Sequence, residues 1–141
     1  MTRHVLLDTN VIVDWLLKRA DFVENATKIF RQIDAGAFVG CISSSAITDV
    51  YYIIETKTPP GYAWEMMEYL YQTLRILPVI RETVRDALDS RMDDFEDAVQ
   101  AAAAENCGID IVVTRDKLDF HNSGLHVYSP EEFLAKKEQE E

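Results

Sequence analysis

The sequence predicts an α/β fold, a three-layer α/β/α sandwich around a central parallel sheet of four or five strands. Short apolar segments that are typical of buried strands alternate along the chain with longer segments of helical periodicity. Turn-forming residues separate these segments, most clearly Pro59-Pro60-Gly61. The chain has 141 residues, of which 48% are hydrophobic and 28% charged. These values suit one globular domain with its own core.

The first part of the chain contains two predicted strands and four predicted helices. Residues 4–8 form a short apolar strand that ends in Asp8, and Asn10 is placed to cap the helix after it. Gly36 is expected to end the second helix. The elements after the first helix are a helix over 22–35, a strand over 38–42, a helix that begins near 45 behind three serines, and a helix over 62–73.

The second part of the chain continues the alternation. The predicted elements are a strand over 75–79, helices over 82–91 and 94–106, strands over 109–114 and 125–128, and a closing helix from 130. Ser129 and Glu132 form a capping pattern for that last helix. Residues 1–134 are therefore expected to form a single domain, and the acidic residues 135–141 a disordered tail.

The composition limits the compartment and the partners. The chain carries 25 Asp and Glu against 14 Lys and Arg, a formal charge of −11, which opposes nucleic-acid binding unless cations or a basic partner protein offset it. Cys41 and Cys107 lie in apolar or alanine-rich surroundings, and no Cys or Cys/His spacing resembles a zinc site. No apolar run approaches the roughly 20 residues of a membrane helix. The first residues lack the regions of a signal peptide, so we expect a cytoplasmic protein.

Two carboxylates follow predicted strands. Asp8 ends the first strand, and Asp116 lies two residues past Thr114 at the end of the fourth. Ligands of parallel sheets bind beyond the carboxyl ends of the strands, so both carboxylates are expected at the same edge of the sheet. A charged carboxylate after a buried strand is costly unless a cation or hydrogen bonds compensate it. An aspartate at such a position also serves as an ordinary helix cap or turn residue.

Two further aspartates lie in the early turns of predicted helices. Asp49 interrupts an apolar segment, and Asp97 lies on a helix face of small residues with Ala101 and Ala104. The helix dipole also favours acids at such positions, which gives each a purely structural explanation. The shared context of the four aspartates predicts a site for one or two Mg²⁺ or Mn²⁺ ions, hard cations that take oxygen ligands. Such ions activate water for attack on a phosphodiester.

Four motifs resemble those of the PIN-domain family, in particular its small toxin-like members, the VapC-type ribonucleases. In family order they are Leu7-Asp8-Thr9-Asn10-Val11, Ser44-Ser45-Ala46-Ile47-Thr48-Asp49, Asp94-Phe95-Glu96-Asp97-Ala98-Val99-Gln100 and Val113-Thr114-Arg115-Asp116-Lys117-Leu118-Asp119-Phe120. Each motif alone is weak, but the four span nearly the whole chain in order. The resemblance implies a PIN-like sandwich and an Mg²⁺- or Mn²⁺-dependent endoribonuclease, the toxin of a toxin–antitoxin pair.

The resemblance also implies roles for individual residues. Asp8, Asp49, Asp97 and Asp116, with Asp119 as the alternative to Asp116, form what we term the acidic cluster, the metal-binding and catalytic residues. The family's second acid is often glutamate, so Asp49 has a shorter reach. Asn10 and Thr114 match the family's polar supporting residues. Arg115 and Lys117 flank Asp116, and we expect them to contact RNA phosphate.

Family members of the toxin type are commonly dimers held inactive by a small antitoxin, so the resemblance implies a homodimer, an antitoxin partner and an RNA substrate. The helix over 62–73 carries more aromatic and methionine surface than one core face needs. We therefore take it as the candidate interface, unless both of its faces are buried.

Two other functions compete with the nuclease. A phosphatase of the haloacid-dehalogenase type also places an aspartate at the end of its first strand, but it needs a second acid where this chain has Asn10. A catalytically inactive PIN-fold module that binds RNA or protein would fit the −11 charge. Affinity for Mn²⁺ would separate the enzyme from the inactive module.

Overall fold

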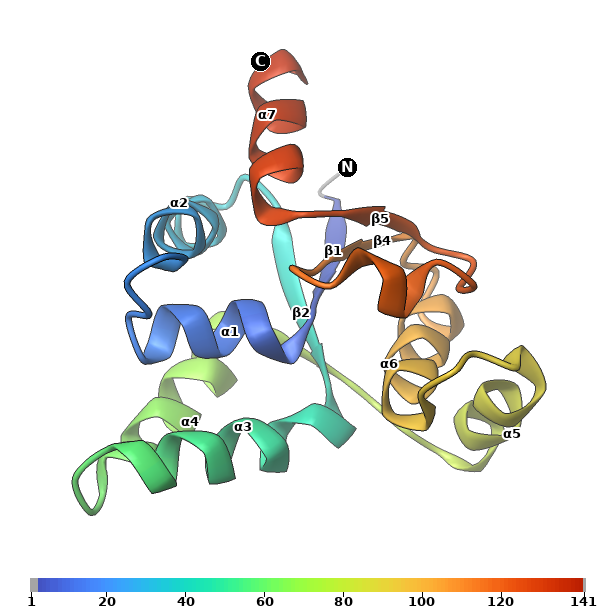
Figure 1. Cartoon of the computed structure of the whole chain (residues 1–141), viewed down its shortest axis with the longest axis horizontal. Coiled ribbons are helices and arrows are strands. Elements are labelled where there is room, and N and C mark those ends of the chain that lie inside the picture. The colour runs from blue at the N-terminus through green and yellow to red at the C-terminus, as the bar shows by residue number, and fades with distance from the viewer. Residues whose placement is uncertain (1–2, 141) are drawn as a thin grey trace.

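The computed structural model describes residues 3–140, which form an α/β/α sandwich (Figure 1). The central sheet has five strands in the order β3-β2-β1-β4-β5, and every neighbouring pair is parallel. The strands are β1 (His4–Leu7), β2 (Val39–Ser43), β3 (Arg75–Leu77), β4 (Ile111–Val113) and β5 (His126–Tyr128). The predicted fold class is confirmed. All five carboxyl ends lie at one edge of the sheet, where ligands of parallel sheets bind.

Seven α-helices and one short 3₁₀ helix connect the described strands. They are α1 (Thr9–Leu16), α2 (Val23–Asp34), α3 (Ser44–Lys57), α4 (Tyr62–Thr73), α5 (Arg81–Ser90), α6 (Phe95–Asn106), the 3₁₀ helix η1 (Lys117–Phe120) and α7 (Pro130–Glu140). Where the sequence predicts both ends of an element, those ends differ from the observed ones by at most two residues. The sequence does not predict η1. Gly36, expected to end the second helix, and Gly108, which follows α6, adopt the left-handed φ values of 79° and 74°.

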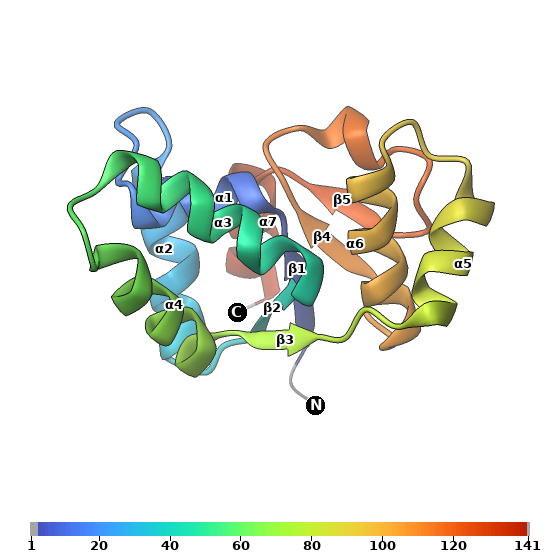
Figure 2. The ribbon, with the colours of Figure 1, turned by 90° about the horizontal axis from the view of Figure 1, so that it is seen from below.

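The side chains of β1 divide the core into two halves. Val5 and Leu7 point to the layer that contains α1, α2, α3, α4 and α7, whereas Leu6 points to the layer of α6. All three side chains are fully buried, as expected for a central parallel strand covered on both faces. Figure 2 shows α1 to α4 on one side of the sheet, and α5 and α6 on the other.

Helix α6 is an alanine-rich helix that is buried on two sides. Ala98 and Ala102 pack in one cluster with Ala87 of α5, and Ala101 and Ala104 pack with Leu6 of the sheet. The small side chains allow α6 to approach the sheet closely, which brings the first turn of α6 to the carboxyl edge.

Helix α7 closes the core at the end of the chain. Ser129 and Glu132 form the predicted capping box: the backbone N–H of Ser129 donates to Glu132 Oε1 at 2.9 Å, and the backbone N–H of Glu132 donates to Ser129 Oγ at 3.1 Å. Residues 135–140, expected to be disordered, are the last part of this helix. Glu141 and residues 1–2 lie outside the described residues. Within 3–140, no helix has the length and apolar character needed to span a membrane.

Replacing Phe133 by alanine tests the contribution of α7 to the domain. The Phe133 ring is fully buried and makes an edge contact with Phe38, with 5.0 Å between the ring centroids. Phe133→Ala is expected to lower the free energy of unfolding by about 3–5 kcal/mol, measured by urea denaturation. Phe95→Ala, at a ring that is 54% exposed, should cost far less. Equal effects of the two substitutions would contradict an integral role for α7.

Candidate active site

Asp8 is a buried carboxylate, 6% exposed, at the carboxyl end of β1. Its Oδ1 accepts a hydrogen bond from the backbone N–H of Thr9, and its Oδ2 accepts one from the hydroxyl of Thr114, both at 2.8 Å. Asp8 is therefore the cap of α1, and the expectation that Asn10 caps this helix is wrong. Burial raises the pKa of Asp8, and the hydrogen bonds from Thr114 and Thr9 oppose that rise.

A chain of polar contacts joins Asp8 to Asp116. The Thr114 hydroxyl, which donates to Asp8, accepts a hydrogen bond from the backbone N–H of Asp116 at 3.0 Å. The side-chain amide of Asn10 donates to Asp116 Oδ2 at 3.2 Å. Asn10 and Thr114 thus lie between two of the predicted carboxylates, at the positions expected of supporting residues.

Asp97, in the first turn of α6, faces the other acids of this edge. Burial, followed by the charges of Asp8, Asp94 and Asp119, raises the pKa of Asp97 to about 7. Asp94 is the cap of α6 and accepts a hydrogen bond from the backbone N–H of Asp97 at 2.9 Å. Carboxylates have this effect on one another only at short range, so the fold brings Asp97 together with Asp8 and the η1 segment.

Asp116 and Asp119 occupy different parts of the site. Asp116 precedes η1 and contributes to the raised pKa of Asp8, whereas Asp119 contributes to the raised pKa of Asp97. Burial, together with Asp116 and Asp94, also raises the pKa of Asp119. Both residues influence the pKa values of other acids at this edge, and the choice between them stays open.

Asp49, on α3, is connected to this edge through Glu96. Burial, followed by a hydrogen bond with Asp49, raises the pKa of Glu96 to about 7. Sequence analysis missed Glu96, because an acid in the first turn of a helix is what the helix dipole favours anywhere. The sequence signal that could have pointed to Glu96 was the short side chain of Asp49, because a short side chain leaves space for a second carboxylate.

The donor set of this edge fits a hard divalent cation. Its oxygens come from carboxylates whose mutual repulsion would be relieved by positive charge. The side chain of Gln100 on α6 is also buried, and its two carboxamide atoms have no hydrogen-bond partner in the described residues. Within residues 3–140, no three His, Cys, Asp or Glu side chains already stand close enough to enclose a metal ion.

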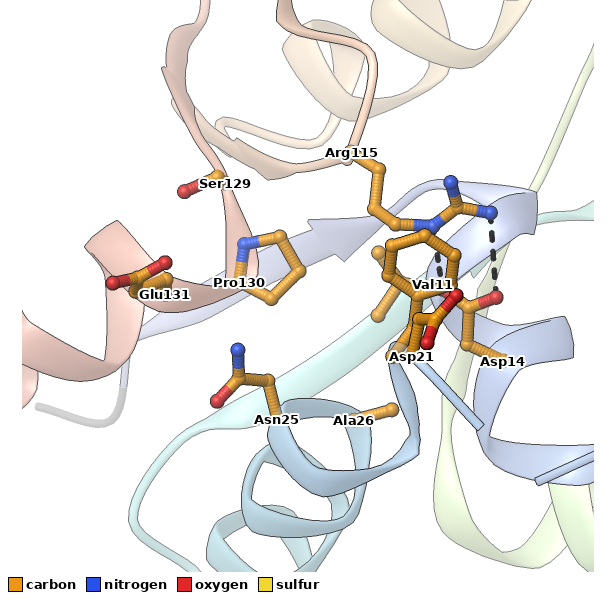
Figure 3. A pocket seen from close by; sticks show the side chains of 10 residues that line it. Val11, Asp14, Asp21, Asn25, Ala26, Arg115, Ser129, Pro130 and Glu131 are labelled. Carbon is orange, nitrogen blue, oxygen red and sulfur yellow. Dashed lines mark hydrogen bonds and ion pairs between the residues drawn. The ribbon is translucent and has the colours of Figure 1, made fainter. Parts of the chain in front are cut away.

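Both cations predicted to contact RNA are engaged by acids. Arg115 Nε donates to Asp14 Oδ2 at 2.6 Å, and its guanidinium lies 3.9 Å from the centroid of the Phe22 ring (Figure 3). Lys117 forms an ion pair with Glu132 at 3.0 Å. Sequence analysis missed Asp14, which is 1% exposed, because its partner lies about a hundred residues further along the chain.

A pocket of about 330 Å³ lies beside the Arg115–Asp14 pair. Figure 3 shows Arg115 and Asp14 at one side of it, and Ser129, Pro130 and Glu131, where β5 leads into α7, at another. The lining residues are Val11, Asp14, Asp21, Phe22, Asn25, Ala26, Arg115, Ser129, Pro130 and Glu131. Its charged groups are mostly acidic, which suits a basic ligand better than a phosphate.

Comparison with known proteins gives a consistent result. The PIN domain family model matches residues 4–118. Ribonuclease VapC1 of Aquifex aeolicus (strain VF5) is 29% identical over 140 residues, which cover 96% of each chain. Among solved structures, DNA-bound VapBC from Salmonella typhimurium superposes with a TM-score of 0.71 at 19% identity, covering 92% of this chain and 99% of that one. A toxin–antitoxin complex from Klebsiella pneumoniae gives 0.68 at 19% identity, with coverage of 89% and 97%.

Replacing Asp97 by asparagine is expected to stabilise the metal-free protein at alkaline pH. The pKa of Asp97 is raised in the folded state from 3.8 to about 7, so its favourable contribution exists below pH 3.8 and is lost as the pH rises through 7. At pH 8 in EDTA, Asp97→Asn should raise the melting temperature by about 3 °C, and at pH 4 it should change little.

The control for this measurement is Asp110→Asn, at an exposed carboxylate before β4 and so at the opposite edge of the sheet. It should leave the melting temperature unchanged at both pH values. A loss of stability in Asp97→Asn at pH 8 would contradict the electrostatic description of this edge.

Proposed function

This chain belongs to the PIN domain family, and from that premise we propose that it is a divalent-metal-dependent endoribonuclease. Hydrolysis of RNA phosphodiester bonds would take place at the acidic cluster, with Mg²⁺ or Mn²⁺ as the cofactor. The observation that carries the proposal is the buried carboxylate of Asp8, joined through Thr114 and Asn10 to Asp116 at the carboxyl edge of the sheet. The name of the ribonuclease VapC1 relative supports RNA as the substrate.

The residues of the chain have separate roles in this proposal. A bound divalent cation would supply charge neutralisation at the phosphodiester and a more acidic water molecule. Asp8 and Asp97, with Asp116 or Asp119, would hold the cation. Thr9 and Thr114 fix the orientation of the Asp8 carboxylate by their two hydrogen bonds.

Asp49 and Glu96 would act on protons rather than only on the cation. Burial, followed by the hydrogen bond with Asp49, raises the pKa of Glu96 to about 7, so the Glu96 carboxyl group would hold a proton close to neutral pH. This proton lowers the repulsion at the edge of the site and is available to a reacting oxygen. Glu96 therefore joins the sequence-predicted residues as a candidate catalytic group.

Arg115 and Lys117 differ in their availability to RNA. The Lys117–Glu132 pair is about half exposed, and such surface pairs contribute only about 0–1 kcal/mol, so Lys117 can exchange Glu132 for a phosphate. The Arg115 guanidinium is held by the buried Asp14, and separating them would leave an unpaired buried charge. We propose that Lys117 contacts phosphate, while contact by Arg115 stays a prediction.

We further propose that the nuclease is the toxin of a toxin–antitoxin pair and acts in the cytoplasm. Support comes from the solved toxin–antitoxin complex of Klebsiella pneumoniae, which this chain resembles in fold. An antitoxin protein would then be its physiological partner. A basic segment of that partner would complement the −11 charge of this chain.

A homodimer is the remaining part of the proposal. Helix α4 buries Ala63 and Leu70 against the core, but Trp64 and Tyr71 are 73% and 70% exposed. The alternative that both faces of this helix are buried is therefore wrong. Exposed aromatic side chains of this size are enriched at protein interfaces, which supports α4 as the contact between two copies.

The inactive binding module is the second candidate function. This candidate is favoured by the −11 charge and by the pairing of Arg115 and Lys117 with acids. Both features lower the affinity of the chain for RNA. The phosphatase alternative has no comparable support, because its second acid position is Asn10, which here donates to Asp116.

The deciding experiment measures cleavage of structured and single-stranded RNA with Mn²⁺, with Mg²⁺ and with EDTA. Wild-type protein should cleave only with metal. Asp8→Asn should lose at least about 100-fold in rate, since even the loss of a residue that only orients a metal ligand costs 10–100-fold. Asp110→Asn, at the opposite edge of the sheet, should cleave as the wild type does. Absence of cleavage on every RNA, together with absence of Mn²⁺ binding by calorimetry, would leave the inactive module.

The dimer is tested by light scattering after size exclusion. Wild-type protein should have the mass of two chains, and Trp64→Glu should have the mass of one, because a charge in an aromatic contact must be desolvated. Leu88→Glu, at an exposed residue of α5 on the other side of the sheet, should remain dimeric. A monomeric wild-type protein would contradict the homodimer.

A further inference from the structure

Helix α1 contacts the segment that follows β4, residues 114–116, at more than one point. Asp8, the cap of α1, accepts a hydrogen bond from the Thr114 hydroxyl at 2.8 Å. In the first turn of the helix, the side-chain amide of Asn10 donates to Asp116 Oδ2 at 3.2 Å. The two ends of the segment are therefore held by the start of α1.

Asp14 adds a charged contact to the middle of the same segment. Asp14 follows Asn10 by four residues on α1, so the two side chains share one face of the helix. Asp14 Oδ2 accepts a hydrogen bond from Arg115 Nε at 2.6 Å, and Asp14 Oδ1 accepts one from Arg115 Nη2 at 3.3 Å (Figure 3). Asn10 Oδ1 accepts a hydrogen bond from the Arg115 backbone N–H at 3.4 Å. Arg115 is thus fixed to α1 through both its backbone and its side chain.

The surroundings of the Arg115 guanidinium favour a single geometry. Asp14 is 1% exposed and binds the guanidinium with both carboxylate oxygens, while the Phe22 ring lies 3.9 Å from Arg115 Cζ at its centroid. A bidentate pair of this kind fixes the direction of the guanidinium as well as its distance. Arg19 also pairs with Asp14, at 3.4 Å, but it is only five residues further along the chain. That second contact joins α1 to the connection that follows it, rather than to β4.

The Asp14–Arg115 pair contributes to placement more than to stability. A buried ion pair is often no more stabilising than apolar side chains of similar volume, because removing both charges from water is costly. Apolar side chains would not supply its fixed geometry. Arg115 stands between Thr114, which donates to Asp8, and Asp116 of the acidic cluster. A fixed Arg115 therefore fixes the backbone on both of its sides.

We propose that Asp14 is a positioning residue of the acidic cluster: through Arg115 it holds residues 114–116 on α1, and so keeps Thr114 and Asp116 in place for the cation. This inference rests on the proposed function, because it assumes a cation bound at the cluster. It gives Arg115 a role that requires no contact with RNA. Loss of the pair is therefore expected to weaken cation binding when no RNA is present.

Arg115→Lys tests the pair with both charges retained. Lysine is a point charge that cannot reproduce the two parallel hydrogen bonds of a guanidinium. The affinity of this variant for Mn²⁺, measured by calorimetry, should fall about 10-fold, the lower end of the range for residues that orient metal ligands. In the metal-free protein, hydrogen exchange of the Asp116 backbone N–H, which donates to Thr114 Oγ, should become about 10-fold faster.

Arg19→Lys is the matched control, because it makes the same change at the other arginine that pairs with Asp14. It should leave both the Mn²⁺ affinity and the exchange of the Asp116 N–H unchanged. Equal effects of the two substitutions would contradict the proposal, since the placement of residues 114–116 would then not be what the Asp14–Arg115 pair provides.

The double substitution Asp14→Leu with Arg115→Met separates placement from stability. It removes one charge of each sign, so the net charge of the chain does not change. Its stability in urea should be close to that of the wild type, because both members of the buried pair are replaced by apolar side chains. Its Mn²⁺ affinity should nevertheless stay about 10-fold lower. An affinity restored to the wild-type value would overturn the proposal, and Arg115→Lys decides the question if the double variant does not fold.

The outcomes distinguish the inference from the proposed function. If the wild type binds no Mn²⁺, the proposed function fails and the inference fails with it. If the wild type and Arg115→Lys bind Mn²⁺ equally, the inference alone is overturned. Unchanged exchange of the Asp116 N–H in metal-free Arg115→Lys would also overturn it, and that measurement does not depend on the metal.

Discussion

The burial of one carboxylate, that of Asp8, constrains the rest of the site. A charged group at the end of a central strand is tolerated only where donors surround it. The fold supplies them from separate elements: the first amide of α1, through Thr9, and the hydroxyl after β4, through Thr114. The order β2-β1-β4 is what makes this possible, because it places the end of β4 directly beside the end of β1. The first turn of α6 adds Asp97 on the remaining side.

The sequence predicts the fold and the location of the site because both depend on local patterns. Apolar runs mark the strands, and the parallel arrangement puts Asp8 and Asp116 at one edge. The details that the sequence does not predict depend on contacts between distant residues. Asp14 is indistinguishable from a solvent-facing acid until Arg115, 101 residues later, is placed beside it. Glu96 is an ordinary first-turn acid until α3 brings Asp49 to it. The cap of α1 is the residue with an extended backbone before the helix, which is Asp8 with φ −69° and ψ 154°. The sequence alone does not show the backbone angles, so it does not distinguish Asp8 from Asn10 as the cap.

The acidic residues near the site fall into two structural groups. Some of the acids neutralise the few cations near the site, as Asp14 does for Arg115 and Glu132 for Lys117. Others lie together at the carboxyl edge, where they raise each other's pKa values. Only the second group represents stored electrostatic repulsion that a cation can relieve. The net charge of −11 alone therefore does not describe the electric field at the site. The distribution of the acids over the structure determines that field.

The long sequence separation between Asp8 and Thr114, 106 positions, has a consequence for synthesis of the protein. A chain growing on the ribosome emerges from its N-terminus, so Asp8 is available long before its partner. Parallel pairing of β1 with β4 closes a loop of more than a hundred residues, which is a late and slow event compared with helix formation. The site is thus a property of the finished chain: an incomplete chain holds its first aspartate but not the hydroxyl and acids that follow β4. If the chain is a ribonuclease, this order of assembly keeps it inactive while it is still attached to the RNA-rich machinery that makes it.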